Sequence, residues 1–128
     1  MSTRAQIEIV DGRDSLLFYR HSDGYPESVV PSLSEFMQWL ADDKIRKNVE
    51  QAAGWLILLG SKEYEKTTSP NSADPSMGWK VGAYEPSTCI HGDIEFFYVI
   101  DLKEKTLKVQ KVYGIDKQTF KTIKALKF

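Results

Sequence analysis

The chain has 128 residues, 41% of them hydrophobic, and it carries a formal net charge of −1. This size suits one domain around a single core, which we assign to residues 1–128. A lone cysteine, Cys89, excludes an intrachain disulfide, and the longest apolar run, residues 55–59, is too short to cross a membrane. Because residues 1–6 also lack an apolar leader, the sequence predicts a soluble cytoplasmic protein.

The first elements in the chain form a predicted β-hairpin. Residues 3–10 alternate apolar and polar side chains, which is the pattern of a half-buried strand. A turn begins at Asp11-Gly12, and residues 15–20 return as the second strand. Gly24 and Pro26 end this strand, because proline cannot donate to a ladder and we expect the glycine to take a positive φ.

Two helices are expected next. Ser32 and Glu35 have the spacing of a capping box, which predicts a helix beginning at Ser32. A single buried stripe follows at helical spacing, formed by Leu33, Phe36, Met37 and Leu40. A second apolar stripe predicts another helix from Val49, which either ends at Gly60 or continues for another turn through residues 62–66. Residues 67–78 are polar and are expected to form a loop.

The second half of the sequence has the pattern of β-structure. Residues 79–84 are expected to form a strand, and residues 94–100 are apolar on nearly both faces, which favours the middle of a sheet. Residues 106–113 return beside them as a lysine-rich strand. Asp116 is a candidate cap for a short C-terminal helix, in which Phe120 and Ile123, three residues apart, would face inward. The expected fold is α+β, with an antiparallel sheet of about five strands packed against two main helices.

Two polar segments are the most distinctive feature. Residues 19–27 read Tyr-Arg-His-Ser-Asp-Gly-Tyr-Pro-Glu and residues 91–95 read His-Gly-Asp-Ile-Glu, so both contain His-x-Asp. Together with Thr-Arg-Ala-Gln-Ile at residues 3–7, they resemble a family of small prokaryotic and phage-associated proteins that has no assigned reaction. The resemblance spans residues 3–102. It implies that a site lies at the two segments, but it brings no catalytic residues with it.

We expect the binding residues among the polar side chains of these segments, namely Arg20, His21, Asp23, Tyr25, His91, Asp93 and Glu95. His21, His91 and Asp93 are the candidates for catalysis, because imidazole titrates near neutral pH. The leading interpretation is a binding or interaction module for an unknown ligand or protein partner. A competing interpretation is conformational, because Asp, Gly and Pro also shape fixed turns.

The alternative function is a small hydrolase that uses a metal ion or a phosphate-containing substrate. Two imidazoles and three carboxylates suit zinc, manganese or iron, and Arg20 offers a fork for phosphate. Against this alternative, the sequence has no compact metal-ligand spacing and no glycine-rich phosphate loop.

Charge is unevenly distributed along the chain. Residues 1–102 carry nine Lys or Arg and 16 Asp or Glu, whereas residues 103–128 carry eight Lys and two acids. Such a basic segment attracts phosphates or acidic partners, or it neutralises the acidic body of the same molecule. The pI near 6.1 and the lack of an RNA-binding signature argue against a nucleic-acid partner.

Overall fold

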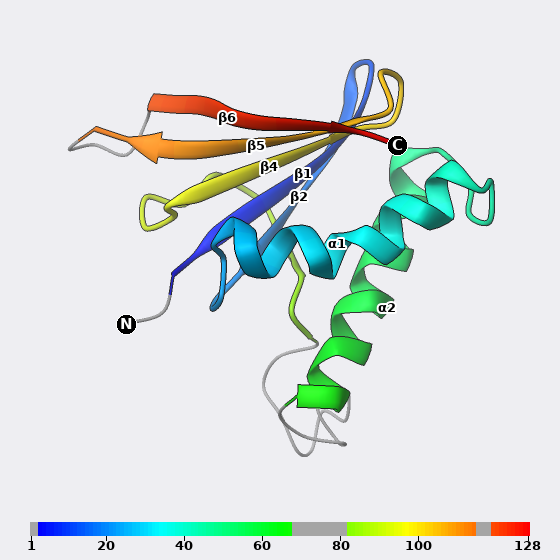
Figure 1. The fold of residues 1–128 in the computed structure, drawn as a ribbon, viewed down its shortest axis with the longest axis horizontal. Coiled ribbons are helices and arrows are strands. Elements are labelled where there is room, and N and C mark those ends of the chain that lie inside the picture. The colour runs from blue at the N-terminus through cyan, green and yellow to red at the C-terminus, as the bar shows by residue number, and fades with distance from the viewer. Residues whose placement is uncertain (1–2, 68–81, 115–118) are drawn as a thin grey trace.

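The structure, a computed structural model, describes residues 3–67, 82–114 and 119–128 (Figure 1). The elements in these ranges are β1 (Ala5–Asp11), β2 (Asp14–Arg20), α1 (Pro26–Ala41), α2 (Val49–Thr67), β3 (Glu85–Ser87), β4 (Phe96–Asp101), β5 (Thr106–Tyr113) and β6 (Thr119–Lys127). Neither helix is long and apolar enough to cross a membrane. Residues 68–78 of the expected loop lie outside the described ranges, as does Asp116. Of the strand expected at 79–84, the described residues 82–84 form bends that lead into β3.

The strands form one mixed sheet in the order β3-β2-β1-β4-β5-β6. The α+β class is confirmed, but the prediction of an antiparallel sheet of about five strands is wrong, because the described sheet has six strands and β1 pairs with β4 in parallel. The two helices return the chain to β3, and the connection after β3, residues 88–95, brings it back to the end of the sheet where β1 begins. Phe96 therefore enters beside Ala5, and β4 runs in the direction of β1.

Both helices lie on one face of the sheet (Figure 1). The hairpin and the central position of β4 agree with the predicted patterns, because alternate side chains of β1 and β4 turn inward towards the helices. The resulting core is fully buried and includes Ile7, Ile9, Phe18, Leu33, Phe36, Leu40, Leu56, Tyr98 and Ile100.

The first helix begins at Pro26 rather than at Ser32. Tyr25 has the extended backbone of an N-cap residue, with φ −74°, and Pro26 occupies the first turn, where a missing amide hydrogen costs nothing. Ser32 instead lies inside α1, and its hydroxyl contacts Glu63 of α2. The capping-box spacing was thus a coincidence within a longer helix. The second helix continues past Gly60 to Thr67.

The C-terminal segment is a strand and not the predicted helix. β6 pairs with β5, and a register shift at Val109/Gln110 leaves Ile123 without a residue directly opposite. This extra residue puts Phe120 beside Val112 on one face and Leu126 beside Leu107 on the other. The three-residue spacing of Phe120 and Ile123, which favoured a helix, does not mark a buried face, because Ile123 lies in a β-bulge and is 49% exposed.

Arg20 and His21 point to opposite faces, as neighbours at the end of a strand do. Arg20 is 4% exposed on the helix side, where its Nη2 lies 2.8 Å from Glu63 Oε2 and its guanidinium lies 5.1 Å from the Tyr84 ring centroid. The Ser32 hydroxyl bonds both the Glu63 carboxylate and the Tyr84 hydroxyl. Burial raises the pKa of Tyr84 to about 12, so this phenol stays protonated. The network joins β2, α1, α2 and the approach to β3.

Candidate functional site

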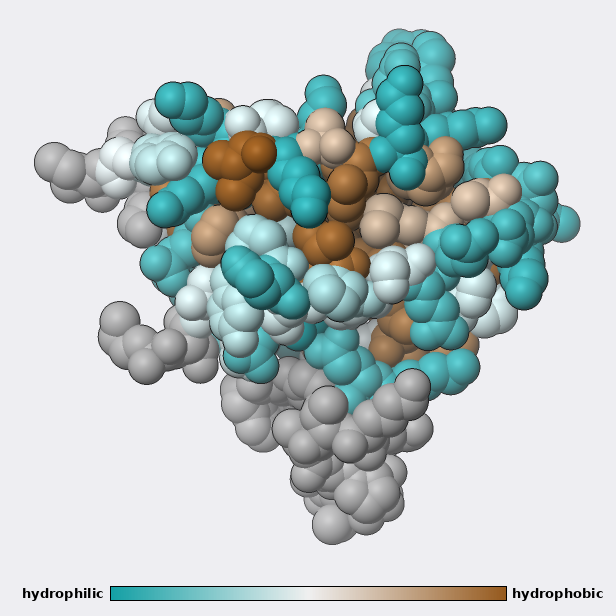
Figure 2. Space-filling model, viewed as in Figure 1, coloured by the Kyte–Doolittle hydropathy of each residue, from teal (hydrophilic) through white to brown (hydrophobic). Residues whose placement is uncertain are grey.

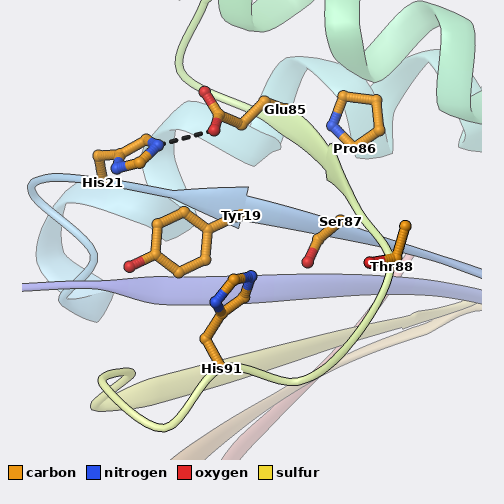
Figure 3. Close-up of a pocket in the computed structure, with 7 residues that line it drawn as sticks. All are labelled: Tyr19, His21, Glu85, Pro86, Ser87, Thr88 and His91. Atoms are coloured by element: carbon orange, nitrogen blue, oxygen red, sulfur yellow. Dashed lines mark hydrogen bonds and ion pairs between the residues drawn. The ribbon is translucent and has the colours of Figure 1, made fainter.

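The two polar segments meet at Tyr19, on the sheet face that neither helix covers. His21 follows Tyr19 by two residues and lies on the same side, while His91 comes from the connection between β3 and β4. The Tyr19 ring centroid is 4.6 Å from the His21 ring centroid and 4.6 Å from that of His91. Figure 3 shows the phenol between the two imidazoles. Because each imidazole centroid is 4.6 Å from the Tyr19 centroid, the two imidazole centroids are at most twice 4.6 Å apart.

His21 is held through both of its ring nitrogens. Its Nε2 lies 2.7 Å from Glu85 Oε1 in β3, and its Nδ1 lies 3.4 Å from Arg4 Nη1. A carboxylate can only accept a hydrogen bond and a guanidinium can only donate one. The neutral tautomer with its proton on Nε2 satisfies both contacts at once, because Nε2 then donates to Glu85 and Nδ1 accepts from Arg4.

Arg4 and Asp93 fix the hydroxyl end of Tyr19. The phenol donates to Asp93 Oδ2 at 2.7 Å, and Arg4 Nη1 lies 3.5 Å from the same hydroxyl. Burial raises the pKa of Tyr19, and the hydrogen bond to Asp93 raises it further, so the phenol acts as a donor. Arg4 Nε is also 3.8 Å from Asp93, but both side chains are about half exposed and this pair adds little stability.

Gln6 holds the second polar segment in place. This β1 side chain is fully buried beneath residues 87–91 and makes three hydrogen bonds to them. Its Nε2 donates to Ser87 Oγ at 3.1 Å and to the Cys89 carbonyl at 2.9 Å, and its Oε1 accepts from the His91 amide at 2.7 Å. The position of His91 against Tyr19 therefore depends on an amide group in the centre of the sheet.

These contacts border an open pocket of about 450 Å³. Its walls combine two imidazoles and a phenol with one carboxylate and two hydroxyls, and they consist of Tyr19, His21, Glu85, Pro86, Ser87, Thr88 and His91 (Figure 3). The aromatic rings offer flat surfaces for stacking, and the polar groups at the rim can exchange hydrogen bonds with a bound molecule.

Several residues proposed from the sequence do not line this pocket. Arg20 is buried on the opposite face, Tyr25 precedes α1 with 40% of its surface exposed, and Glu95 is exposed at the start of β4. Asp23 has a φ of 53°, so the positive φ expected at Gly24 occurs one residue earlier. His21 and His91 line the pocket, and Asp93 accepts a hydrogen bond from Tyr19, which also lines it.

Gly24 is required for space and not for its φ. A Cβ at this position would lie 2.8 Å from Ala5 Cβ and 2.9 Å from the Thr3 carbonyl oxygen. The Gly24 amide donates to that carbonyl, and the Tyr98 hydroxyl donates to the Gly24 carbonyl at 2.7 Å. The corner is thus packed directly against β1 and β4.

The carboxylates and imidazoles of the two segments do not gather around one point. The described ranges contain no group of three or more His, Cys, Asp or Glu side chains placed to hold a metal ion. Cys89 is exposed, and it takes part in the pocket's support through its carbonyl oxygen.

Sequence reasoning missed four contributors to the site, namely Arg4, Gln6, Tyr19 and Glu85. Tyr19 had a usable signal, because it precedes His21 by two residues on an extended strand and must share its face. Arg4 and Gln6 alternate with the apolar residues Ala5, Ile7 and Ile9, which marks their face but not their partners. Glu85 had no signal, because only the pairing of β3 with β2 brings it to His21.

Comparison with known proteins gave no match to a protein-family model, a curated protein or a solved structure.

Proposed function

We propose that the protein is a binding module whose ligand occupies the pocket between His21 and His91. The observation that carries this proposal is the convergence of the two imidazoles on Tyr19 from distant parts of the sequence. A turn that served only to shape the chain would not need a phenol placed between two imidazoles above an open pocket.

Binding fits the pocket better than catalysis because three of its polar side chains, Tyr19, His21 and Ser87, are already hydrogen-bonded to neighbours. The Tyr19 hydroxyl donates to Asp93 and the Ser87 hydroxyl donates to the Cys89 carbonyl. His21 contacts Glu85 and Arg4 through its two nitrogens. A nucleophile needs a hydrogen-bonded base to take its proton, and neither the Tyr19 nor the Ser87 hydroxyl donates to an imidazole. These hydrogen bonds hold the side chains of the pocket wall in place, which lowers the conformational entropy lost when a ligand binds.

The lining indicates the chemistry of the ligand. A flat polar molecule would stack on the exposed His91 ring and meet the Glu85 carboxylate and the Thr88 hydroxyl at the rim. A carboxylate accepts hydrogen bonds and repels anions, so the ligand should present N–H or O–H donors on that side. We therefore propose a small, neutral or cationic, planar molecule.

An NMR titration tests the proposal. The histidine ring resonances of labelled protein are followed while nucleosides, nucleobases, aromatic amines and amino acids are added one by one. At least one of these compounds should shift both the His21 and the His91 resonances with a saturating curve. His91→Ala should weaken the binding at least tenfold, and Leu16→Ala, an exposed substitution outside the pocket lining, should not alter it. If no compound shifts both imidazoles, the pocket is not a site for this class of ligand.

A further inference from the structure

The outer face of α2 carries a row of exposed residues. Leu58 is 41% exposed, and Gly54, one turn before it, is exposed as well. Trp55 is 39% exposed, and its ring packs edge-on against Trp39 of α1 with 5.9 Å between the ring centroids. Glu50, Gly54, Leu58 and Lys62 recur at every fourth residue, so they form one ridge along the helix. Figure 2 shows brown apolar surface among polar side chains in the region of α2.

No described part of the chain packs closely against Gly54. A Cβ at this position would have nothing within 4 Å, so no neighbouring element requires a glycine there. Glycine in the interior of a helix is nonetheless less favourable than alanine. Next to it is a hollow of about 350 Å³, bordered by Glu50, Gln51, Gly54, Trp55 and Leu58. A missing side chain on an exposed helix, beside two apolar ones, suits the close approach of another backbone.

We propose that two copies of the protein associate through α2, with their helices antiparallel and a twofold axis between Gly54 and Leu58. In this arrangement Leu58 of each copy enters the hollow over Gly54 of the other copy. The ridge is self-complementary, because reversing its direction puts Leu58 opposite Gly54 and Lys62 opposite Glu50.

The charges on the ridge favour a second copy of this chain over an unrelated protein partner. Glu50 and Lys62 are both exposed, and no ion pair joins either of them to another described residue. Within one helix they are about 18 Å apart, beyond the screening length of about 10 Å at 0.1 M salt. Across the proposed interface each Glu50 would meet one Lys62 of the other copy, which gives two pairs of opposite charge in the dimer. A single helix pair is small for a permanent interface, so the dimer should be weak, reversible and sensitive to salt.

Sedimentation velocity on the full chain, over a range from micromolar to near-millimolar concentration at low salt, tests the proposal. The wild type should shift from monomer to dimer as concentration rises, and the shift should weaken in high salt. Gly54→Ala should raise the melting temperature while weakening dimerisation at least tenfold, because its methyl group suits the helix but fills the hollow. Leu58→Ala should also weaken dimerisation, whereas Leu16→Ala, with nearly the same exposure on β2, should leave it unchanged.

Charge exchange tests the antiparallel register. Glu50→Lys and Lys62→Glu should each weaken the dimer several-fold, and the double exchange should restore it, since the two residues are too far apart to interact within one helix. A wild type that stays monomeric throughout the range would overturn the proposal. So would a dimer that Gly54→Ala leaves intact, or a double exchange that is no tighter than the single variants. None of these readouts depends on the Tyr19 pocket, so this inference stands or falls separately from the proposed function.

Discussion

Replacing Gln6 by leucine should release the segment that carries His91. The substitution removes hydrogen bonds of 3.1, 2.9 and 2.7 Å to Ser87, Cys89 and His91. At a net value of about 1 kcal/mol each, their loss costs about 3 kcal/mol. Burying the more apolar leucine in the same enclosed site offsets about 1 kcal/mol. We therefore expect the free energy of unfolding to fall by about 2 kcal/mol.

Two measurements check this expectation. Urea unfolding followed by circular dichroism gives the change in stability, and nuclear Overhauser effects between the Tyr19 and His91 rings report the position of the released segment. The matched control is Gln110→Leu on β5, because Gln110 makes one 3.2 Å hydrogen bond to Thr122 at an exposed position. The control should cost less than about 0.5 kcal/mol. If Gln6→Leu keeps both its stability and the ring contacts, Gln6 does not support the site.

Three further substitutions test other parts of the structure. Gly24→Ala should cost about 1–3 kcal/mol, because its Cβ would lie 2.8 Å from Ala5 Cβ. Glu63→Gln should cost about 3 kcal/mol, because it leaves the buried Arg20 guanidinium without its carboxylate. Burial raises the pKa of Glu8, so ionisation of this carboxyl destabilises the folded state once the pH rises above the ordinary value of 4.5. Glu8→Gln should therefore increase stability at pH 7, and the gain should disappear below pH 4.5.

Each of these substitutions has a control in the same chain. Gly54→Ala is the counterpart of Gly24→Ala, and it should raise the melting temperature because no atom crowds the new methyl group. The double variant Arg20→Met/Glu63→Met should be more stable than the single variant Glu63→Gln, since it leaves no charge buried at this place. A Glu8→Gln gain that persists at pH 3 would show that its origin is not ionisation.

The sequence predicted the elements whose periodicity is set by burial. The alternation in residues 3–10 and the turn at Asp11-Gly12 predicted the hairpin, and residues 106–113 were predicted with the observed bounds of β5. These patterns held because one side of each element faces a continuous core, so the period of the hydrophobic residues matches that of the backbone.

The errors arose where a local pattern had two physical origins. The spacing of Phe120 and Ile123 is shared by a helix and by a strand with a bulge, and only pairing with β5 decides between them. The spacing of Ser32 and Glu35 fits a capping box, but Pro26 offers an earlier start that lengthens the buried stripe to include Val29. The parallel pairing of β1 with β4 depends on the path of both helices, which no short motif encodes.

The site was foreseen only in part for a similar reason. The sequence indicated His21, His91 and Asp93 as site residues, but Arg20 was predicted to be a binding residue together with them. Strand alternation assigns Arg20 to the buried face, where it pairs with Glu63. The contacts of Tyr19 with His91 and of Gln6 with residues 87–91 depend on tertiary structure, because they join segments that are far apart in the chain.

The central claim is that His21 and His91 share one site built around Tyr19. Nuclear Overhauser effects from the Tyr19 ring protons to the ring protons of each histidine, recorded on uniformly labelled protein, test it most directly. With both ring centroids 4.6 Å from that of Tyr19, cross-peaks to both imidazoles should be strong. A Tyr19 ring that shows contacts to His21 but none to His91 would contradict the account, because the two polar segments would then lie apart.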